Sequence, residues 1–190
     1  MALVTVTPPT STPVSLSEAK EQCRVTESNH DGLITRLIKA AEDSIESYTG
    51  ARLSEQTVQL ELDGFPSGCI DLGVYPVTAI TSVLYDDTDD VETALVLDTD
   101  YWKNLGGMYP ALTAVESWPA TKYGKPASVR ILMTVGYAAS ADVPQDIRHA
   151  ILLRVKEYFD NAGESVTGAE IYNTVSSVDS LAHMHRRIGI

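Results

Sequence analysis

Seven acidic side chains fall close together in the middle of the chain, and their type makes them the first candidates for chemistry: Asp86, Asp87, Asp89, Asp90, Glu92, Asp98 and Asp100. Paired carboxylates can hold Mg²⁺ or Ca²⁺ or act as a general acid and base, but both roles need carboxylates that converge from separate elements into a cleft. Most of these acids are nearly consecutive, which is typical of a hairpin turn facing water. We therefore predict a solvated acidic surface, with a metal-dependent hydrolase using the acids of residues 86–100 as an alternative.

Histidine and cysteine are too scattered to predict a metal centre or a nucleophile. None of the four histidines has a cysteine or acidic partner at ligand spacing: His30, His149, His183 and His185. Cys23 and Cys69 form neither a disulfide framework nor a CxxC motif, so we expect two buried, reduced thiols. The chain contains no GxxxxGK[ST], GxSxG or HExxH sequence and no EF-hand spacing. We predict that the protein is not an enzyme and uses no cofactor.

Aromatic side chains offer a third kind of site, because a platform of rings can stack on bases or sugars. The candidates are Tyr101, Trp102, Trp118, Tyr123 and Tyr137. No basic groove accompanies them, so we expect core and subunit-contact roles. A ligand-binding module that uses Trp102 and Trp118 stays open as an alternative.

Charge and length limit the class of protein. The chain has 190 residues, 14 Lys and Arg against 26 Asp and Glu, and a net charge of −12, with most of the excess in residues 51–140. Such a surface does not suit duplex DNA binding, which needs clustered cations. At 44% apolar composition we expect a folded, soluble protein of one ordinary domain or a small domain with an insertion. Residues 1–14 lack Lys and Arg and contain prolines, so we expect no secretory signal, and no apolar run approaches a membrane span.

The elements that must position these residues begin with helices. Ser15 and Glu18 match a capping box, which predicts a short helix over residues 16–24. A second helix starts at a Ser28 or Asp31 cap and ends at Gly50. A third starts at Pro144, and its apolar positions cover more than one face, which predicts contacts on two sides. A last short helix or hook is expected over residues 181–187.

Between the helices the apolar period changes from about four to two, which predicts strands. We expect five or six mainly antiparallel strands near residues 58–62, 70–72, 77–85, 95–97, 112–118 and 128–135.

Together these elements predict an α+β fold in which two N-terminal helices, one long C-terminal helix and a short terminal helix form a helical core that carries an inserted, mainly antiparallel β domain. The expected divisions are an extended arm over 1–14, the helical core over 15–54 and 141–163, the β-rich insertion over 55–140, and a flexible segment with a C-terminal helix over 164–190.

The order of blocks resembles the head-to-tail connector, or adaptor, proteins of long-tailed bacteriophages and related gene-transfer particles. The N-terminal part of the pattern is Ser-Leu-Ser-Glu-Ala-Lys at 15–20, Arg-Val at 24–25, Leu-Ile at 33–34, Ala-Ala at 40–41 and Ile-Glu-Ser-Tyr-Thr-Gly at 45–50. Later blocks are Pro-Val at 76–77, Val-Leu-Tyr at 83–85, Tyr101, Trp-Pro at 118–119, Val-Arg-Ile at 129–131, Gly-Tyr at 136–137, Val-Pro at 143–144, Ala-Ile-Leu-Leu at 150–153 and Tyr158. Together they cover about residues 15–163 and the last ten residues.

The resemblance implies structural work in the virion neck, in a protein made in the host bacterial cytoplasm. Such proteins form a closed homo-oligomeric ring, usually a dodecamer, under the portal. They extend the channel through which double-stranded DNA passes without sequence-specific binding, and they offer a surface to a stopper or tail-completion protein. No membrane is involved. A neck stopper or tail-terminator role is the closest alternative.

Two sets of residues receive expected contacts, the first from this resemblance and the second from the wide apolar surface of the third helix. The C-terminal segment commonly reaches the portal in the family, which implies portal contacts for Leu181, Met184, His185, Arg186, Arg187, Ile188 and Ile190. Ring self-association is assigned to apolar residues of the third helix: Leu152, Leu153, Tyr158 and Phe159. One departure concerns the family's basic and acidic residues after a Tyr-x-x-Asn step, because Asn161 leads here into Ala-Gly-Glu, so no function is carried onto those positions.

Overall fold

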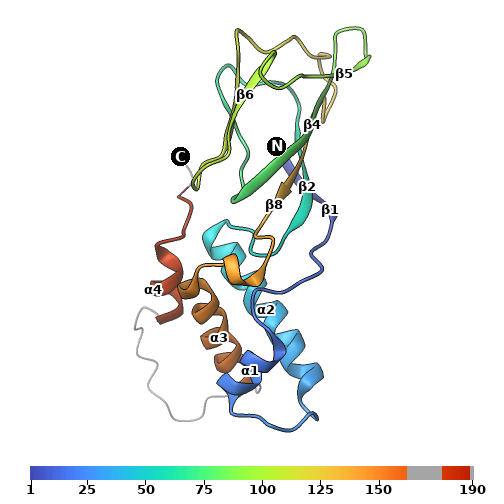
Figure 1. Cartoon of the computed structure of the whole chain (residues 1–190). Coiled ribbons are helices and arrows are strands. Elements are labelled where there is room, and N and C mark those ends of the chain that lie inside the picture. Colours follow the sequence, from blue (N-terminus) through green and yellow to red (C-terminus); the bar gives the residue numbers. More distant parts are fainter. Residues whose placement is uncertain (162–176, 189–190) are drawn as a thin grey trace. The chain divides into compact units, whose positions relative to one another are not determined.

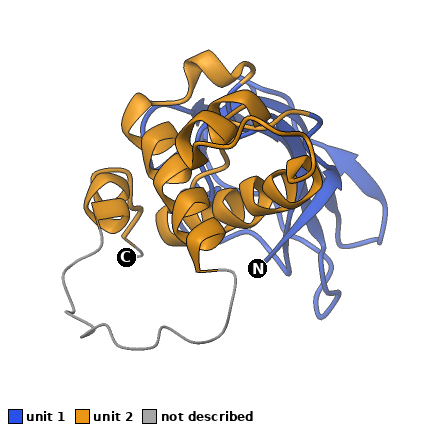
Figure 2. Cartoon of the chain, turned by 90° about the horizontal axis from the view of Figure 1, so that it is seen from below, with its two compact units in different colours: residues 1–10, 54–137 blue, residues 11–53, 138–190 orange. Residues whose placement is uncertain are grey.

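A computed structural model describes residues 1–161 and 177–188 of the chain. The chain divides into two compact units (Figure 2). Unit 1 contains residues 1–10 and 54–137, and unit 2 contains residues 11–53 and 138–190. The described residues of unit 1 are rich in strands and those of unit 2 in helices, so the predicted α+β fold is confirmed (Figure 1).

Unit 1 contains two antiparallel sheets, of five and three strands. The order of the first is β1-β2-β8-β4-β5, built from Ala2–Thr7, Gln56–Leu62, Val129–Val135, Val77–Asp86 and Glu92–Ala94. The order of the second is β3-β7-β6, built from Ile70–Asp71, Ala111–Ala114 and Tyr101–Asn104.

Strand β8 lies at the centre of the larger sheet because every second side chain is apolar and buried. Val129, Ile131, Met133 and Val135 are all buried, and the residues between them are only half-buried. Ile131 lies opposite Leu60 of β2 and Val83 of β4, and all three belong to one apolar core. The period-two alternation therefore sets which face of the sheet is buried.

The first residues are an ordered strand. Residues 2–7 pair with β2 in register from Ala2 opposite Glu61 to Thr7 opposite Thr57, with an irregularity between Thr5 and Thr7. The Thr, Pro and Ser residues of this stretch predict an extended arm over residues 1–14. The alternation of apolar and threonine side chains in this stretch is the β-strand signal, and the prolines that follow end the strand.

Unit 2 contains four α-helices and one short 3-10 helix (η1, Ser140–Asp142) in its described residues. The α-helices are α1 (Leu16–Cys23), α2 (Asp31–Thr49), α3 (Gln145–Asp160) and α4 (Ser177–His183). The predicted capping box at the start of α1 is present, since Ser15 accepts a bond from the backbone of Glu18 and the Glu18 carboxylate accepts one from the backbone of Ser15. Gly50 ends α2 with a φ of 75°, in the left-handed region that favours glycine.

Several elements differ from the predicted ones: β6 (Tyr101–Asn104) was not predicted, β7 ends at Ala114 and not at residue 118, and three further differences have a visible cause. Neither predicted cap of α2 is used, because Asp31 instead forms an ion pair with Lys20 at 2.7 Å and His30 occupies the cap position. The return strand after the acidic turn is Glu92–Ala94, not residues 95–97, because the tight turn lets Asp86 pair with Glu92 at once. The last helix begins at Ser177 and ends at His183, four residues before the predicted end, because the Arg187 backbone N–H bonds to the Thr49 carbonyl.

Candidate assembly surfaces

The apolar face of α3 is divided among the other helices of unit 2. Ile147, Ala150, Ile151 and Val155 are buried, and α3 contacts α1, α2 and α4. The predicted contacts on two sides are thus met within the unit. The four residues assigned to ring contacts are each half-buried: Leu152, Leu153, Tyr158 and Phe159. They leave apolar surface open to a further partner.

An open groove of about 690 Å³ runs between α1 and α3. It is lined by Glu18, Glu21, Gln22, Arg24, Leu152 and Lys156. Leu152 is the only apolar side chain in that lining, so the groove combines one hydrophobic position with charges of both signs. Phe159, seven residues further along α3, packs edge-on against the His30 ring with centroids 5.8 Å apart.

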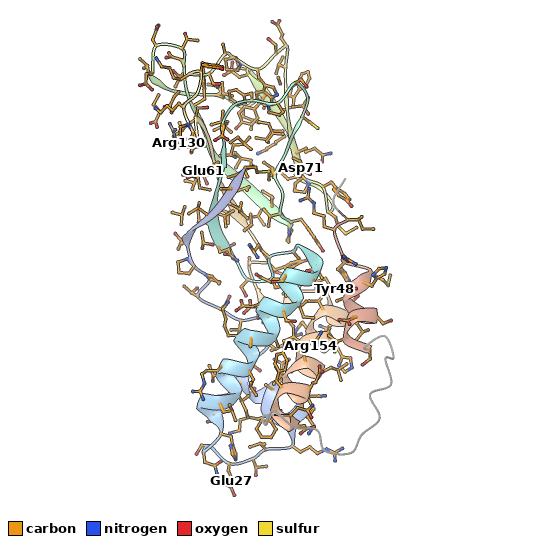
Figure 3. The ribbon with its side chains drawn as sticks, turned by 180° about the vertical axis from the view of Figure 1, so that it is seen from behind. Glu27, Tyr48, Glu61, Asp71, Arg130 and Arg154 are labelled. Carbon is orange, nitrogen blue, oxygen red and sulfur yellow. The ribbon has the colours of Figure 1, made fainter. Side chains whose placement is uncertain are left out.

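The C-terminal segment is tied to the ends of α2 and α3. His185 Nε2 lies 2.6 Å from Asp146 Oδ2, and the Arg186 guanidinium lies 5.1 Å from the ring centroid of Tyr48. The Arg187 backbone N–H donates to the Thr49 carbonyl at 2.8 Å. The Arg154 guanidinium of α3 donates to the Asp179 carboxylate of α4 at 3.2 Å. Tyr48 and Arg154 are labelled in Figure 3. These contacts fix the direction in which residues 184–188 leave α4.

The same contacts divide the residues that were predicted to reach the portal. Met184 is 79% exposed and Ile188 is 65% exposed, which is unusual for large apolar side chains. Arg186 is also exposed, whereas Leu181, His185 and Arg187 are half-buried. Ile190 lies outside the described residues. Met184, Arg186 and Ile188 are thus the described members of the set whose side chains are exposed.

The contact between His185 and Asp146, at the start of α3, changes the pKa of the Asp146 carboxyl group. Burial pushes the pKa of Asp146 up, but the hydrogen bond and charge of His185 and the backbone N–H groups of Ile147 and Asp146 outweigh it. The pKa of Asp146 therefore lies below its ordinary value. The carboxylate is ionised near neutral pH and holds the C-terminal segment.

One acid of the turn, Asp86, is buried and does not face water as predicted. Asp86 is 3% exposed instead of solvated. Its carboxylate accepts two bonds from Arg130, at 2.8 and 2.9 Å, and lies 2.9 Å from Lys125 Nζ. Arg130 and Lys125 hold the pKa of Asp86 well below its usual range. A metal ion would have to displace both cations, and among the described residues no cluster of three or more His, Cys, Asp or Glu could hold one.

The remaining acids of the turn are oriented by their own backbone. Asp87 accepts bonds from the backbone N–H groups of Asp89 and Val91, both at 2.9 Å. Lys125 also pairs with Asp90 at 2.8 Å, so the turn is fixed to the loop at residues 121–127. The turn is thus a braced acidic surface and not a carboxylate cleft.

The aromatic candidates do not form one platform. Trp118 stacks on Phe65 with centroids 4.9 Å apart, and its ring N–H donates to the Gly68 carbonyl. Tyr101 is buried in the core, whereas Trp102 is 52% and Tyr123 fully exposed. Cys69 is exposed, contrary to the prediction, because it directly precedes the inward-facing Ile70.

The outer edge of β1 is a surface that was not predicted from the sequence. Val4 and Val6 are 44% and 54% exposed there, and no described strand pairs with the other side of β1. The composition of residues 1–7, uncharged and rich in β-branched side chains, was the signal that could have found it.

The N-terminal part of the chain matches a known family. Residues 13–73 match the profile of the family described as "Phage gp6-like head-tail connector protein". This confirms, over that stretch, the resemblance to head-to-tail connectors seen in the sequence. That family is a structural connector family and not an enzyme family. No curated protein matches the chain significantly.

The fold also matches solved structures along its whole length. A chain from the neck of an empty gene transfer agent (GTA) particle, computed with C6 symmetry, has a TM-score of 0.82 and 22% identity, covering 100% of this chain and 97% of that one. A chain from the virion of a native GTA particle has a TM-score of 0.81 and 21% identity, again covering 100% and 97%. For the neck of a native GTA particle computed with C12 symmetry, the TM-score is 0.79, the identity 20% and the coverage 100% and 97%. This similarity establishes a shared fold.

No described helix is both long and apolar enough to cross a lipid bilayer.

Proposed function

We propose that this chain is a ring-forming head-tail adaptor in the neck of a phage-like or gene-transfer particle. It attaches below the portal, extends the DNA channel and links the capsid to the tail. The observation that carries the proposal is the coincidence of two comparisons: the connector family matches residues 13–73, and chains from GTA particles share the fold of the whole chain. We propose twelve copies, in keeping with the C12 symmetry used for one of those necks.

Portal docking falls to the C-terminal segment in this proposal. Met184 and Ile188 expose apolar side chains, and Arg186 adds a charged group beside them. Contacts of Arg186 with Tyr48 and of His185 with Asp146 hold the segment in one direction, which lowers the entropic cost of binding. Such a short, oriented apolar anchor suits insertion between subunits of a larger ring.

Ring self-association falls to the exposed parts of α3. Leu152 in the α1–α3 groove, with Leu153, Tyr158 and Phe159, offers apolar surface flanked by charges of both signs. A neighbouring copy could bury the leucine and pair with Arg24 or Glu21. This arrangement suits an interface that has to be specific as well as apolar.

The acidic surface suits a conduit for DNA. With a net charge of −12 and the braced turn at residues 86–92, the chain repels phosphates instead of binding them. Double-stranded DNA would pass through such a ring without adhering and without sequence-specific contacts.

Size-exclusion chromatography with light scattering, on the full chain with and without purified portal rings from the same particle, tests the proposal. We expect stable co-elution with the portal. The double variant Met184→Glu, Ile188→Glu should weaken portal binding at least tenfold, because both side chains are exposed and their replacement leaves the fold intact. Thr35→Glu, an exposed position on α2, is the matched control. Equal binding by the two variants would remove the portal assignment.

A stopper or tail-terminator role is the remaining candidate in the same class. It predicts that the chain binds another neck or tail component tightly and the portal not at all. The same chromatography, run with the stopper or tail-completion protein in place of the portal, separates the two roles.

A further inference from the structure

The outer edge of β1 is unprotected against pairing with another strand. β1 has six residues, and Ala2–Thr7 contain no charge, proline or glycine. Proteins usually protect exposed edges with short strands, charges, prolines or a covering element, because unpaired N–H and C=O groups recruit other strands. The other edge of this sheet, β5, has only three residues and begins with Glu92. Of the two edge strands of the larger sheet, β1 is therefore the one more available to pair with another strand.

The side chains of β1 also favour a partner at this edge. Val4 and Val6 are exposed and, two residues apart, lie on the same face of the strand, where they form an apolar strip. Leu3 turns to the other face and packs against the core. The strip thus combines free backbone hydrogen-bonding groups with apolar side chains, which is the combination that strand addition uses.

A second surface of unit 1 complements this edge. β6 is an outer strand of the three-stranded sheet, and its Trp102 is 52% exposed. Its first residue is engaged by the preceding turn, since the Asp98 N–H bonds to the Tyr101 carbonyl, but the rest of β6 has no strand on its outer side among the described residues. Pairs of an aromatic and a β-branched side chain are favourable across neighbouring strands.

The edges of β1 and β6 carry few charged side chains, which favours contact between copies at these two edges. Each copy carries a net charge of −12, so most faces of two copies repel each other. Residues 1–10 contain no charged side chain, and the only one in residues 101–115 is Lys103. These two edges can therefore approach each other with less charge repulsion than the other faces of the chain.

We propose that the β1 edge of one copy pairs with the β6 edge of the next copy, so that strands of unit 1 join neighbouring subunits. The inference rests on the proposed ring, because a closed ring needs two different surfaces that fit each other, and pairing of β1 with another β1 would stop at a dimer.

Cross-linking in assembled rings tests this pairing. The full chain carries Val4→Cys and Trp102→Cys in a Cys69→Ser background, and Cys23 stays unmodified because it is only 5% exposed and burial raises its pKa, Lys156 opposing this in part. After assembly on the portal, a short bismaleimide should give a ladder of covalent oligomers. Each single-cysteine variant should give none.

Each other outcome overturns the pairing in its own way. Covalent dimers from Val4→Cys alone would mean that β1 pairs with β1. Intact rings, seen by negative-stain microscopy, without a ladder would leave the ring and reject the strand edges. Failure of the unmodified chain to form rings would reject the proposed function and the pairing together.

A second variant checks the edge without cysteines. Val4→Lys with Val6→Lys places two charges on the strip and should reduce the ring fraction at least tenfold while circular dichroism stays unchanged. Thr81→Lys, at an exposed position of the interior strand β4, should leave ring assembly as it is. Undiminished rings from the double lysine variant would contradict the pairing.

Discussion

At the scale of single residues, Asp86 and Arg130 show how one ion pair organises a whole turn. Arg130 lies on β8, and its two terminal guanidinium nitrogens donate to the carboxylate of Asp86 at the end of β4. One of these nitrogens, Nη2, also donates to the Glu92 carboxylate at 2.7 Å. Lys125 closes the network from the neighbouring loop. A paired and fully hydrogen-bonded carboxylate stabilises the fold in its charged form.

Asp86→Asn should therefore lower the melting temperature at neutral pH. The folded-state pKa of Asp86 is below the unfolded value, so its stabilisation is fully present above the unfolded pKa and is lost as pH falls through the folded one. The difference between wild type and variant should shrink in strongly acidic buffer. Thermal unfolding from pH 7 downward measures it, with Asp89→Asn as an exposed control. A constant difference at every pH would contradict the role of the charge.

The capping box at Ser15 gives a second residue-scale prediction. Ser15→Ala should cost about 1 kcal/mol, or about 2–4 °C in melting temperature, because a backbone N–H at the start of α1 loses its acceptor. Ser47→Ala, an exposed position within α2, should change the melting temperature much less. Equal shifts in calorimetry would show that the cap does not stabilise the helix.

Some residue-scale features could be predicted from the sequence and others could not. The capping box was predictable because its two partners are three residues apart. The burial of Asp86 was not, because Arg130 is 44 residues away and only the pairing of β4 with β8 brings the two together. Local spacing carries no information about such long-range partners.

At the scale of elements, the join between β8 and the following chain depends on Gly136. Its φ is +94°, and a Cβ there would lie 2.2 Å from the Ser54 carbonyl oxygen. Gly136→Ala should therefore destabilise unit 1 by several degrees, because backbone would have to move. At Gly32, inside α2, an added Cβ would meet no atom within 4 Å. Gly32→Ala should therefore raise the free energy of unfolding by about 0.5–1 kcal/mol. Chemical denaturation compares them, and equal effects would contradict this close approach.

Element types followed from sequence periodicity more reliably than element ends. The alternation in β8 and the three-to-four spacing in α2 predicted both elements. The end of α4 and the return strand β5 were misplaced, because the tight Asp87–Val91 turn and the Arg187–Thr49 bond set those ends and both are tertiary features. The pairing of β1 was not predictable for the related reason that its partner strand is distant in sequence.

At the scale of the whole molecule, net charge governs association between copies. Since every copy carries −12, repulsion between copies should weaken as salt shortens the screening length to about 10 Å at 0.1 M. The oligomer fraction of the purified chain should rise with NaCl between about 20 and 200 mM. Analytical ultracentrifugation measures this rise. A fall with salt would mean that attractive ion pairs and not apolar strands hold the copies together.

The place of the chain in an intact particle is the most direct test of the central claim. Cryo-electron microscopy of particles carrying this gene product, reconstructed around the neck, should show a closed ring of this chain between the portal and the next tail component. Complete particles whose neck lacks this chain, although the chain was available during assembly, would contradict the proposed role.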